Sequence, residues 1–339
     1  MSDSSPPAPV FGGVGTVLGG TGGVWRVRLR ESGDTVESSI RGRLKKADMD
    51  KRVDGGRKRD TVQSAAAMLK LAVGDEVVVE PAAGHTGDGP AWAIAEILPR
   101  RSKLARREPG GGHGERVVVA NVDQVVIVFA AANPEPHPRM LDRFLVIAEG
   151  NALHARVVIN KAELTDEHLT RERFADYERA GYPVHYTSAK IGLGMNELHE
   201  ALLGRTSALS GPSGVGKSSL LNALYPGLNL RVGEISESVN KGRHTTVGAL
   251  LHPLPDGGFV ADTPGLREIG MWGLEASDLD RCYREFQPLL DRCRFNDCTH
   301  RVEPGCEVRA AVADGLVSAA RYDSYLKLRE ELESAPRVW

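Results

Sequence analysis

The chain has 339 residues, more than one typical domain uses, and it is long enough for two or three domains that each bury a core. Hydrophobic residues make up 41% and charged residues 26%, and no apolar run approaches the roughly 20 residues that span a bilayer, which excludes an integral membrane protein. The net charge of −2 excludes a generic binder of polyanions.

The first 100 residues predict a tail followed by a small β-domain. Residues 1–11 are rich in serine and proline, lack the layout of a secretory signal, and predict a disordered tail. Residues 12–100 contain short strand-like stretches between glycine-rich turns, which predicts an OB-fold β-barrel. No helical pattern follows the glycines of Gly12–Gly23, so these glycines do not indicate a dinucleotide-binding fingerprint.

Basic residues are concentrated in two places of this first part. Nine lysines and arginines lie between Arg41 and Arg59, and five more lie between Arg100 and Arg107. Such clusters attract the phosphate backbone of nucleic acids, although a solvated loop and a linker are the simpler interpretation of the pattern alone.

Residues 101–116 predict a linker, and residues 117–270 predict an α/β domain of alternating strands and helices. Buried strands are expected at 123–129, 155–159 and 207–210, and an amphipathic helix at 139–151. Residues 271–339 predict a mostly helical domain with helices at 276–290, 306–313 and 318–333.

A phosphate-binding loop lies between the strand at 207–210 and the helix expected after Gly216. Its glycines let backbone N–H groups face phosphates, Lys217 neutralises the β- and γ-phosphate oxygens, and Ser218 supplies a hydroxyl to Mg²⁺. The residues expected to bind phosphate are Gly211, Pro212, Ser213, Gly214, Val215, Gly216, Lys217, Ser218 and Ser219.

Two further motifs indicate that the base is guanine rather than adenine. Asn160, Lys161, Ala162 and Glu163 follow a strand, and Ser188, Ala189 and Lys190 follow the next one. In GTPases the fourth residue of the first motif is usually aspartate, whose carboxylate accepts the guanine N1–H and amine hydrogens. Glu163 offers the same carboxylate one methylene farther out, which weakens guanine selectivity if the loop does not recede.

Residues for the metal ion and for hydrolysis are expected between the phosphate loop and residue 270. Asp262 is predicted to hold Mg²⁺ through water, and Gly265 to donate its N–H to the γ-phosphate. Either Thr245 or Thr246 is expected to complete the Mg²⁺ shell. Leu266 stands where many GTPases have a water-orienting glutamine, so intrinsic hydrolysis should be slow. His244 and Lys217 are the candidate catalytic residues. For His244, an ordinary loop histidine is an equally good interpretation.

Cys293, Cys298, His300 and Cys306 lie within 14 residues, a pattern that predicts a closed structural Zn²⁺ site with one ion per chain. A disulfide with a spare thiol is the weaker alternative, and so few cysteines indicate the reducing cytoplasm. Cys282 is interpreted as a small buried residue.

The base motif precedes the phosphate loop, the reverse of the usual GTPase order. A small barrel, this circularly permuted GTPase arrangement, the Gly-Arg-His-Thr-Thr segment at 242–246, Asp-Thr-Pro-Gly at 262–265 and the Cys₃His segment together resemble the bacterial ribosome-small-subunit-dependent GTPase A family over residues 12–330. The resemblance implies a multidomain α/β protein: an OB-fold domain, a circularly permuted P-loop GTPase domain and a C-terminal helical zinc-binding domain.

The resemblance also implies a late assembly factor of the small ribosomal subunit. It implies slow GTP hydrolysis stimulated by the subunit, contacts of the barrel and the zinc segment with ribosomal RNA, and other assembly factors as partners. We expect a monomer. Two other functions remain open at this point: a metallochaperone GTPase whose Cys/His cluster carries cargo metal, and an RNA-binding module with a degenerate nucleotide site.

Overall fold

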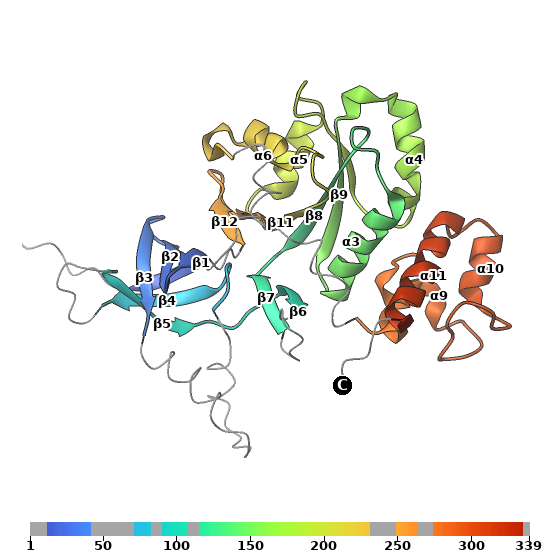
Figure 1. Cartoon of the computed structure of the whole chain (residues 1–339), viewed down its shortest axis with the longest axis horizontal. Coiled ribbons are helices and arrows are strands. Elements are labelled where there is room, and N and C mark those ends of the chain that lie inside the picture. The colour runs from blue at the N-terminus through green and yellow to red at the C-terminus, as the bar shows by residue number, and fades with distance from the viewer. Residues whose placement is uncertain are drawn as a thin grey trace, which may run out of the picture. The chain divides into compact units, whose positions relative to one another are not determined.

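The computed structural model describes residues 12–41, 71–82, 90–107, 115–230, 249–262 and 274–334 (Figure 1). The described residues belong to two compact units. One is drawn from Met1–Lys103, Val118–Asn121 and Arg243–Leu251, and the other from Leu104–Val117, Val122–Gly242 and His252–Trp339. In these described ranges, no helix is long and apolar enough to cross a membrane.

The first unit contains a closed five-stranded barrel, which confirms the predicted β-barrel. The strands pair in the order β1-β2-β3-β5-β4, and β3 and β5 run parallel while the other pairs are antiparallel. The strands are β1 (Gly13–Thr21), β2 (Val24–Leu29), β3 (Thr35–Ile40), β4 (Glu76–Pro81) and β5 (Trp92–Ile97).

Alternating apolar residues of these strands fill the barrel. Val17, Val27 and Ile94 are completely buried at its centre. Gly20 of β1 serves packing, because a Cβ there would lie 2.5 Å from the ring of Trp25. This glycine therefore lets an indole lie against the backbone.

Two strands follow the barrel in the chain, β6 (Lys103–Arg107) and β7 (Glu115–Ala120), and they form a two-stranded sheet. Residues 103–107 and 115–116 of the segment expected to be a linker are therefore parts of strands.

The second unit is built on a sheet with the strand order β10-β9-β8-β11-β13-β12. Its elements are β8 (Gln124–Ala130), α3 (Pro138–Gly150), β9 (His154–Asn160), η2 (Ala162–Leu164), α4 (Glu167–Arg179), β10 (Val184–Tyr186), α5 (Met195–Leu202), β11 (Thr206–Ser210), α6 (Lys217–Leu224), η3 (Pro226–Leu228), β12 (Leu250–Pro253) and β13 (Phe259–Asp262). Helices α3 and α4 cover one face, and α5 and α6 cover the other (Figure 1).

Burial explains why these segments form a parallel sheet. All seven residues of β8 are buried, as expected for a strand covered on both faces. The neighbours β10 and β9, β9 and β8, β8 and β11, and β11 and β13 all run parallel, so their carboxyl ends meet at one edge. The base motifs and the phosphate loop follow β9, β10 and β11, and this edge therefore brings them together.

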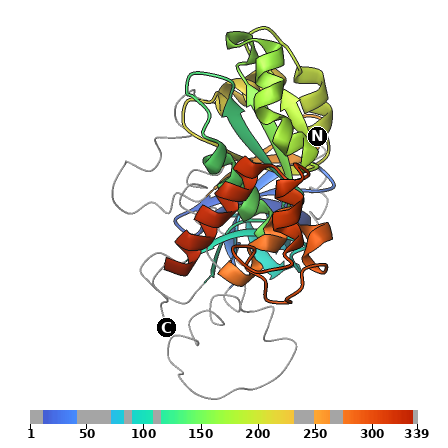
Figure 2. The ribbon, with the colours of Figure 1, turned by 90° about the vertical axis from the view of Figure 1, so that its right-hand side faces the viewer.

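The chain after residue 274 forms a segment that packs on α3; Figure 1 shows its orange and red elements next to the green α3, and in Figure 2 the red helices face the viewer. Its elements are η4 (Ala276–Asp278), η5 (Asp280–Cys282), α9 (Gln287–Leu290), α10 (Glu307–Ala313) and α11 (Ala319–Ser334). The last two match predicted helices.

Residues 276–290, by contrast, were expected to be one helix, and they form only short helical turns. Tyr283 adopts an extended backbone, which interrupts the helix. Tyr283 and Phe286 stack at 5.0 Å and are fully buried with Tyr325 of α11. Burial of these aromatic rings outweighs local helix propensity in this segment.

Candidate functional site

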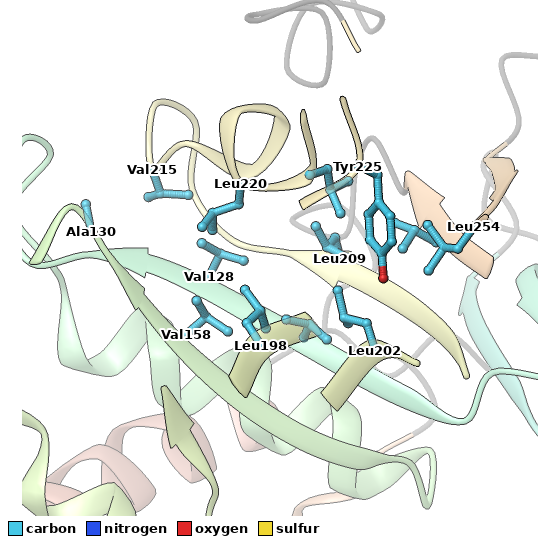
Figure 3. Packing of buried hydrophobic residues seen from close by; sticks show 13 residues of the cluster. Val128, Ala130, Val158, Leu198, Leu202, Leu209, Val215, Leu220, Tyr225 and Leu254 are labelled. Atoms are coloured by element: carbon cyan, nitrogen blue, oxygen red, sulfur yellow. The ribbon is translucent and has the colours of Figure 1, made fainter. Parts of the chain in front are cut away.

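The phosphate loop connects β11 to α6 and depends on glycine for its path. Gly211 has φ of 131°, and a Cβ there would lie 2.0 Å from the carbonyl oxygen of Val128. The side chain of Val215 is 1% exposed and packs into the core below, with Leu220 beside it and Val128 beneath (Figure 3). The sheet core thus fixes a loop whose backbone stays at the sheet edge.

The polar side chains of this loop suit an anion. Lys217 Nζ donates hydrogen bonds to the carbonyl oxygens of Gly211 at 2.9 Å and Pro212 at 2.8 Å, so the ammonium lies over its own loop. Ser218 is buried in the first turn of α6. An ammonium, a hydroxyl and the N-terminal N–H groups of a helix are what a polyphosphate with a divalent cation requires.

The first base motif is attached directly to the phosphate loop through Asn160. This side chain is 2% exposed, and its Nδ2 donates to the carbonyl oxygen of Val215 at 2.9 Å. Its Oδ1 lies 3.4 Å from the N–H of Ala189 in the second base motif. Lys161 has φ of 59°, and its Nζ donates to the carbonyl oxygen of Asn133. One amide therefore joins three loops that are far apart in the sequence.

The remaining base-motif residues surround the same place. Ala162 donates its N–H to the carbonyl oxygen of Thr187 at 3.0 Å, and Ser188 Oγ accepts from the N–H of Ile191 at 3.3 Å. In the described part of the chain, Glu163 Oε2 is buried and has no hydrogen-bond partner. Lys190 is exposed. A buried carboxylate oxygen without a donor is suited to accept hydrogens from a bound base.

Several predicted residues lie outside the described residues, namely His244, Thr245, Thr246 and Gly265. Asp262 is the last residue of β13, and its backbone pairs in register with Leu209 of β11. Leu209 lies two residues before Gly211, so Asp262 lies on the adjacent strand close to the start of the phosphate loop.

All four predicted metal ligands converge in the C-terminal segment. The ligand atoms of Cys293, Cys298, His300 and Cys306 lie within 4.8 Å of one another, and all four side chains are buried. Nδ1 of His300 is 3.3 Å from Cys306 Sγ and 3.7 Å from Cys293 Sγ. Cys282 is a free, buried thiol outside this set, as predicted, and burial raises its pKa to about 12.

This arrangement fits Zn²⁺. A tetrahedral zinc with bonds of about 2.0–2.3 Å separates its ligand atoms by about 3.3–3.8 Å, which agrees with the sulfur–nitrogen distances of His300. All four cysteines are free, so a disulfide does not explain the cluster. Burial raises the pKa of the Cys298 thiol to about 12, and a bound dication would offset this cost of forming thiolate. Four ligands leave no open position for a substrate.

The loop that carries the cluster is fixed by hydrogen bonds. Tyr322 and Tyr325 of α11 donate their hydroxyls to the carbonyl oxygens of His300 at 2.5 Å and Thr299 at 3.0 Å. Glu303 accepts from the N–H groups of Thr299 and Arg301. Although burial raises the pKa of Glu303, a hydrogen bond from the Thr299 hydroxyl and further bonds from backbone N–H groups lower it to about 2. Glu303 is therefore ionised, and its carboxylate holds the loop together through these hydrogen bonds.

A buried ion-pair network, which sequence reasoning missed, joins this segment to the sheet. Arg321 of α11 donates to Asp142 of α3 at 2.5 Å and to Glu285 at 2.8 Å, and its side chain is 3% exposed. Burial lowers the pKa of Arg321, but the two carboxylates hold it well above its ordinary value. Asp142 and Arg321 are 179 positions apart. The only available signal was an aspartate in the apolar pattern of α3.

Fold and site together define a permuted phosphate-loop nucleotide-binding protein with a Cys₃His metal cluster. The sequence pattern of the RsgA GTPase family matches residues 97–272. The chain belongs to this family.

Named relatives cover nearly the whole chain. The small ribosomal subunit biogenesis GTPase RsgA of Gemmatimonas aurantiaca is 58% identical over 318 residues, which are 94% of this chain and 97% of the relative. The protein of the same name from Ectopseudomonas mendocina is 44% identical over 274 residues, or 80% of this chain and 77% of the relative.

Two solved structures share the fold. The crystal structure of YjeQ from Thermotoga maritima matches with a TM-score of 0.75 and 33% identity, covering 96% of this chain and 100% of that chain. YloQ, described as a circularly permuted GTPase, matches with a TM-score of 0.69 and 27% identity, covering 98% of this chain and 100% of that one. The permuted fold predicted from the motif order is thereby confirmed.

Proposed function

We propose that this protein is a GTPase that acts in biogenesis of the small ribosomal subunit, as the names of its relatives state for those proteins. The proposal depends above all on the hydrogen bond from the Asn160 side chain to the Val215 carbonyl oxygen, because it joins a guanine-type motif to a phosphate loop. A nucleotide bound along the sheet edge would touch both.

Each predicted residue then has a role in nucleotide binding. The loop Gly211–Ser219 cradles the phosphates, with Lys217 on the β- and γ-oxygens. Ser218, Asp262 and one of Thr245 or Thr246 hold Mg²⁺. Gly265 donates to the γ-phosphate, and His244 positions the attacking water. Because the side chain of Leu266 has no hydrogen-bonding group to orient water, hydrolysis is slow until the subunit completes the site.

Guanine is read by the loops after β9 and β10. Asn160, Lys161 and Ala162 shape the first loop, and Ser188, Ala189 and Lys190 shape the second. Glu163 supplies the carboxylate, and its buried, unpaired Oε2 among the described residues supports this role. We expect GTP and GDP to displace a fluorescent guanine nucleotide at lower concentrations than ATP. Equal competition by ATP would contradict guanine selectivity.

Zinc has a structural role in this proposal. One Zn²⁺ per chain is held by Cys293, Cys298, His300 and Cys306, and the closed, buried set argues against a cargo site. The barrel and the C-terminal segment would contact ribosomal RNA. The basic residues 42–59 lie outside the described residues, and Arg41, at their start, pairs with Glu80 at 2.7 Å.

GTP turnover with and without purified small subunits tests the proposal. We expect slow turnover by the protein alone and a clear increase when subunits are added, in a cytoplasm-like buffer with magnesium. The large subunit serves as the control partner. Turnover that does not respond to the small subunit would remove the proposed partner while leaving the GTPase assignment intact.

Lys217→Ala tests the nucleotide site itself. Loss of the ammonium leaves phosphate charge uncompensated, and we expect stimulated turnover to fall by about 100-fold or more. Lys327→Ala is the matched control, since Lys327 is an exposed lysine on α11 paired with Asp323. Near-normal turnover in Lys217→Ala would place hydrolysis elsewhere.

A further inference from the structure

The two ring nitrogens of His300 face different partners. Nδ1 faces the sulfur atoms of Cys293 and Cys306, as a metal ligand must. Nε2 lies 3.3 Å from Oδ2 of Asp280, which precedes His300 by 20 residues and lies outside the Cys/His motif. The ring is 1% exposed, so the hydrogen on Nε2 needs a protein partner rather than water.

We propose that Asp280 is a positioning residue for the metal site. Its carboxylate accepts the Nε2–H of His300, which fixes the tautomer whose Nδ1 lone pair is free to face the sulfur atoms of Cys293 and Cys306. A carboxylate in this place also makes the imidazole a stronger donor to a metal. The proposal rests on the zinc site proposed above and assigns a role to a residue outside the ligand set.

The carboxylate of Asp280 is held in place from its other side. Its Oδ1 accepts the N–H of Arg281 at 2.7 Å, so both oxygens have defined partners. The flanking residues Leu279 and Cys282 are buried and pack in one core with Val146 of α3. Their burial anchors the short helix η5 against a helix of the central sheet. The orientation of His300 is therefore set by the packed core rather than by the metal-binding loop alone.

The acidic side chain within the metal-binding loop is committed elsewhere. Glu303 Oε1 accepts from the N–H of Thr299 at 2.8 Å, and Oε2 accepts from the N–H groups of Arg301 and Val302 at 2.9 and 3.0 Å. These bonds use its oxygens within the loop. Asp280 is thus the carboxylate that orients the imidazole.

Zinc affinity of the full-length chain tests this assignment. Competition against a chromophoric chelator would compare the parent protein with Asp280→Ala, Asp280→Asn and Asp278→Asn. We expect Asp280→Ala to bind zinc about 10- to 100-fold more weakly. Asp280→Asn should lie between, because an amide oxygen still accepts the hydrogen bond but carries no charge. Asp278 is exposed on η4, and Asp278→Asn should stay within about twofold of the parent.

Two further readouts separate positioning from general support of the fold. At saturating zinc, Asp280→Ala should unfold at nearly the parent temperature. With Co²⁺ in place of zinc, its d–d bands should shift, since the imidazole is no longer held in one orientation. Equal zinc affinities of Asp280→Ala and Asp278→Asn would overturn the proposal. A parent chain that binds no zinc would instead overturn the metal site itself.

Discussion

The phosphate loop and the Cys/His cluster are both short motifs, but they are held in different ways. Around Lys217 the backbone creates the site: glycines set the path, and Val215 anchors it to the sheet core. Around His300 side chains create the site: two tyrosine hydroxyls bind the carbonyl oxygens of His300 and Thr299, and a carboxylate faces the imidazole. The first arrangement leaves a loop open to a ligand, and the second surrounds the place of a metal ion.

The two sites also rest on separate cores. The core below the phosphate loop contains residues of β8, β11, α5 and α6, whereas the C-terminal core contains Val146 of α3 and residues after 274. The α3 helix, on the face of the sheet opposite α6, contacts η5 and α11 of the segment, and Asp176 of α4 accepts a hydrogen bond from Ser318 (Figure 1). We therefore expect loss of the metal to leave the phosphate loop unchanged.

Removal of the metal should have the largest effect among the tests of this separation. A chelator strong enough to strip zinc should lower the unfolding temperature of the second unit by about 10 °C or more, because structural zinc contributes its binding energy to folding. Affinity for GDP below the new unfolding temperature should change less than about threefold. Calorimetry and nucleotide titration measure the two quantities, and loss of GDP binding together with the metal would show that the cores are not independent.

Arg321→Ala breaks the connection between the segment and the sheet. The change leaves Asp142 and Glu285 buried without their cation, and we expect a loss of about 3–5 kcal/mol in urea unfolding. Lys327→Ala on the same helix removes an exposed ion pair and should cost no more than about 1 kcal/mol. Similar losses in both variants would mean that the buried network adds little.

Gly216→Ala acts on the phosphate loop and on its contact with Asn160, away from the metal cluster. Gly216 has φ of 92°, and a Cβ would lie 2.5 Å from Nδ2 of Asn160, so alanine adds strain and displaces the amide that joins the loops. We expect a loss of about 1–3 kcal/mol in stability and at least tenfold in GDP affinity. Gly227→Ala, where a Cβ meets nothing within 4 Å, is the control. Unchanged GDP affinity in Gly216→Ala would show that nucleotide binding does not depend on the contact between Asn160 and the phosphate loop.

The smallest expected effect is a pH dependence in the sheet. Burial, and then the nearby Arg156, lower the pKa of His185 below its ordinary value of 6.5. The folded state therefore binds fewer protons than the unfolded state below pH 6.5, and stability present above that pH is lost as pH falls through the folded pKa. His185→Gln should flatten unfolding free energy between pH 7 and 5.5. His168→Gln, on the exposed surface of α4, should leave the slope unchanged.

The local chemistry of both motifs could be predicted from the chain alone. Gly211–Ser218 and the four Cys/His ligands are each contiguous or nearly so, and their function depends on residue type and spacing. The reversed order of base motif and phosphate loop also determined the permuted fold, because strand ends of a parallel sheet meet at one edge. Buried strands such as β8 followed from apolar runs.

The distant groups that support these motifs could be identified only in the folded chain. Asn160 meets Val215 across 55 positions, and Arg321 meets Asp142 across 179. Asp280 faces His300 from a segment that local propensity assigned to one long helix, which burial of Tyr283 and Phe286 divided into short turns. Hydrogen bonds between distant residues leave no periodic trace in the chain, because only the folded backbone brings the partners within reach.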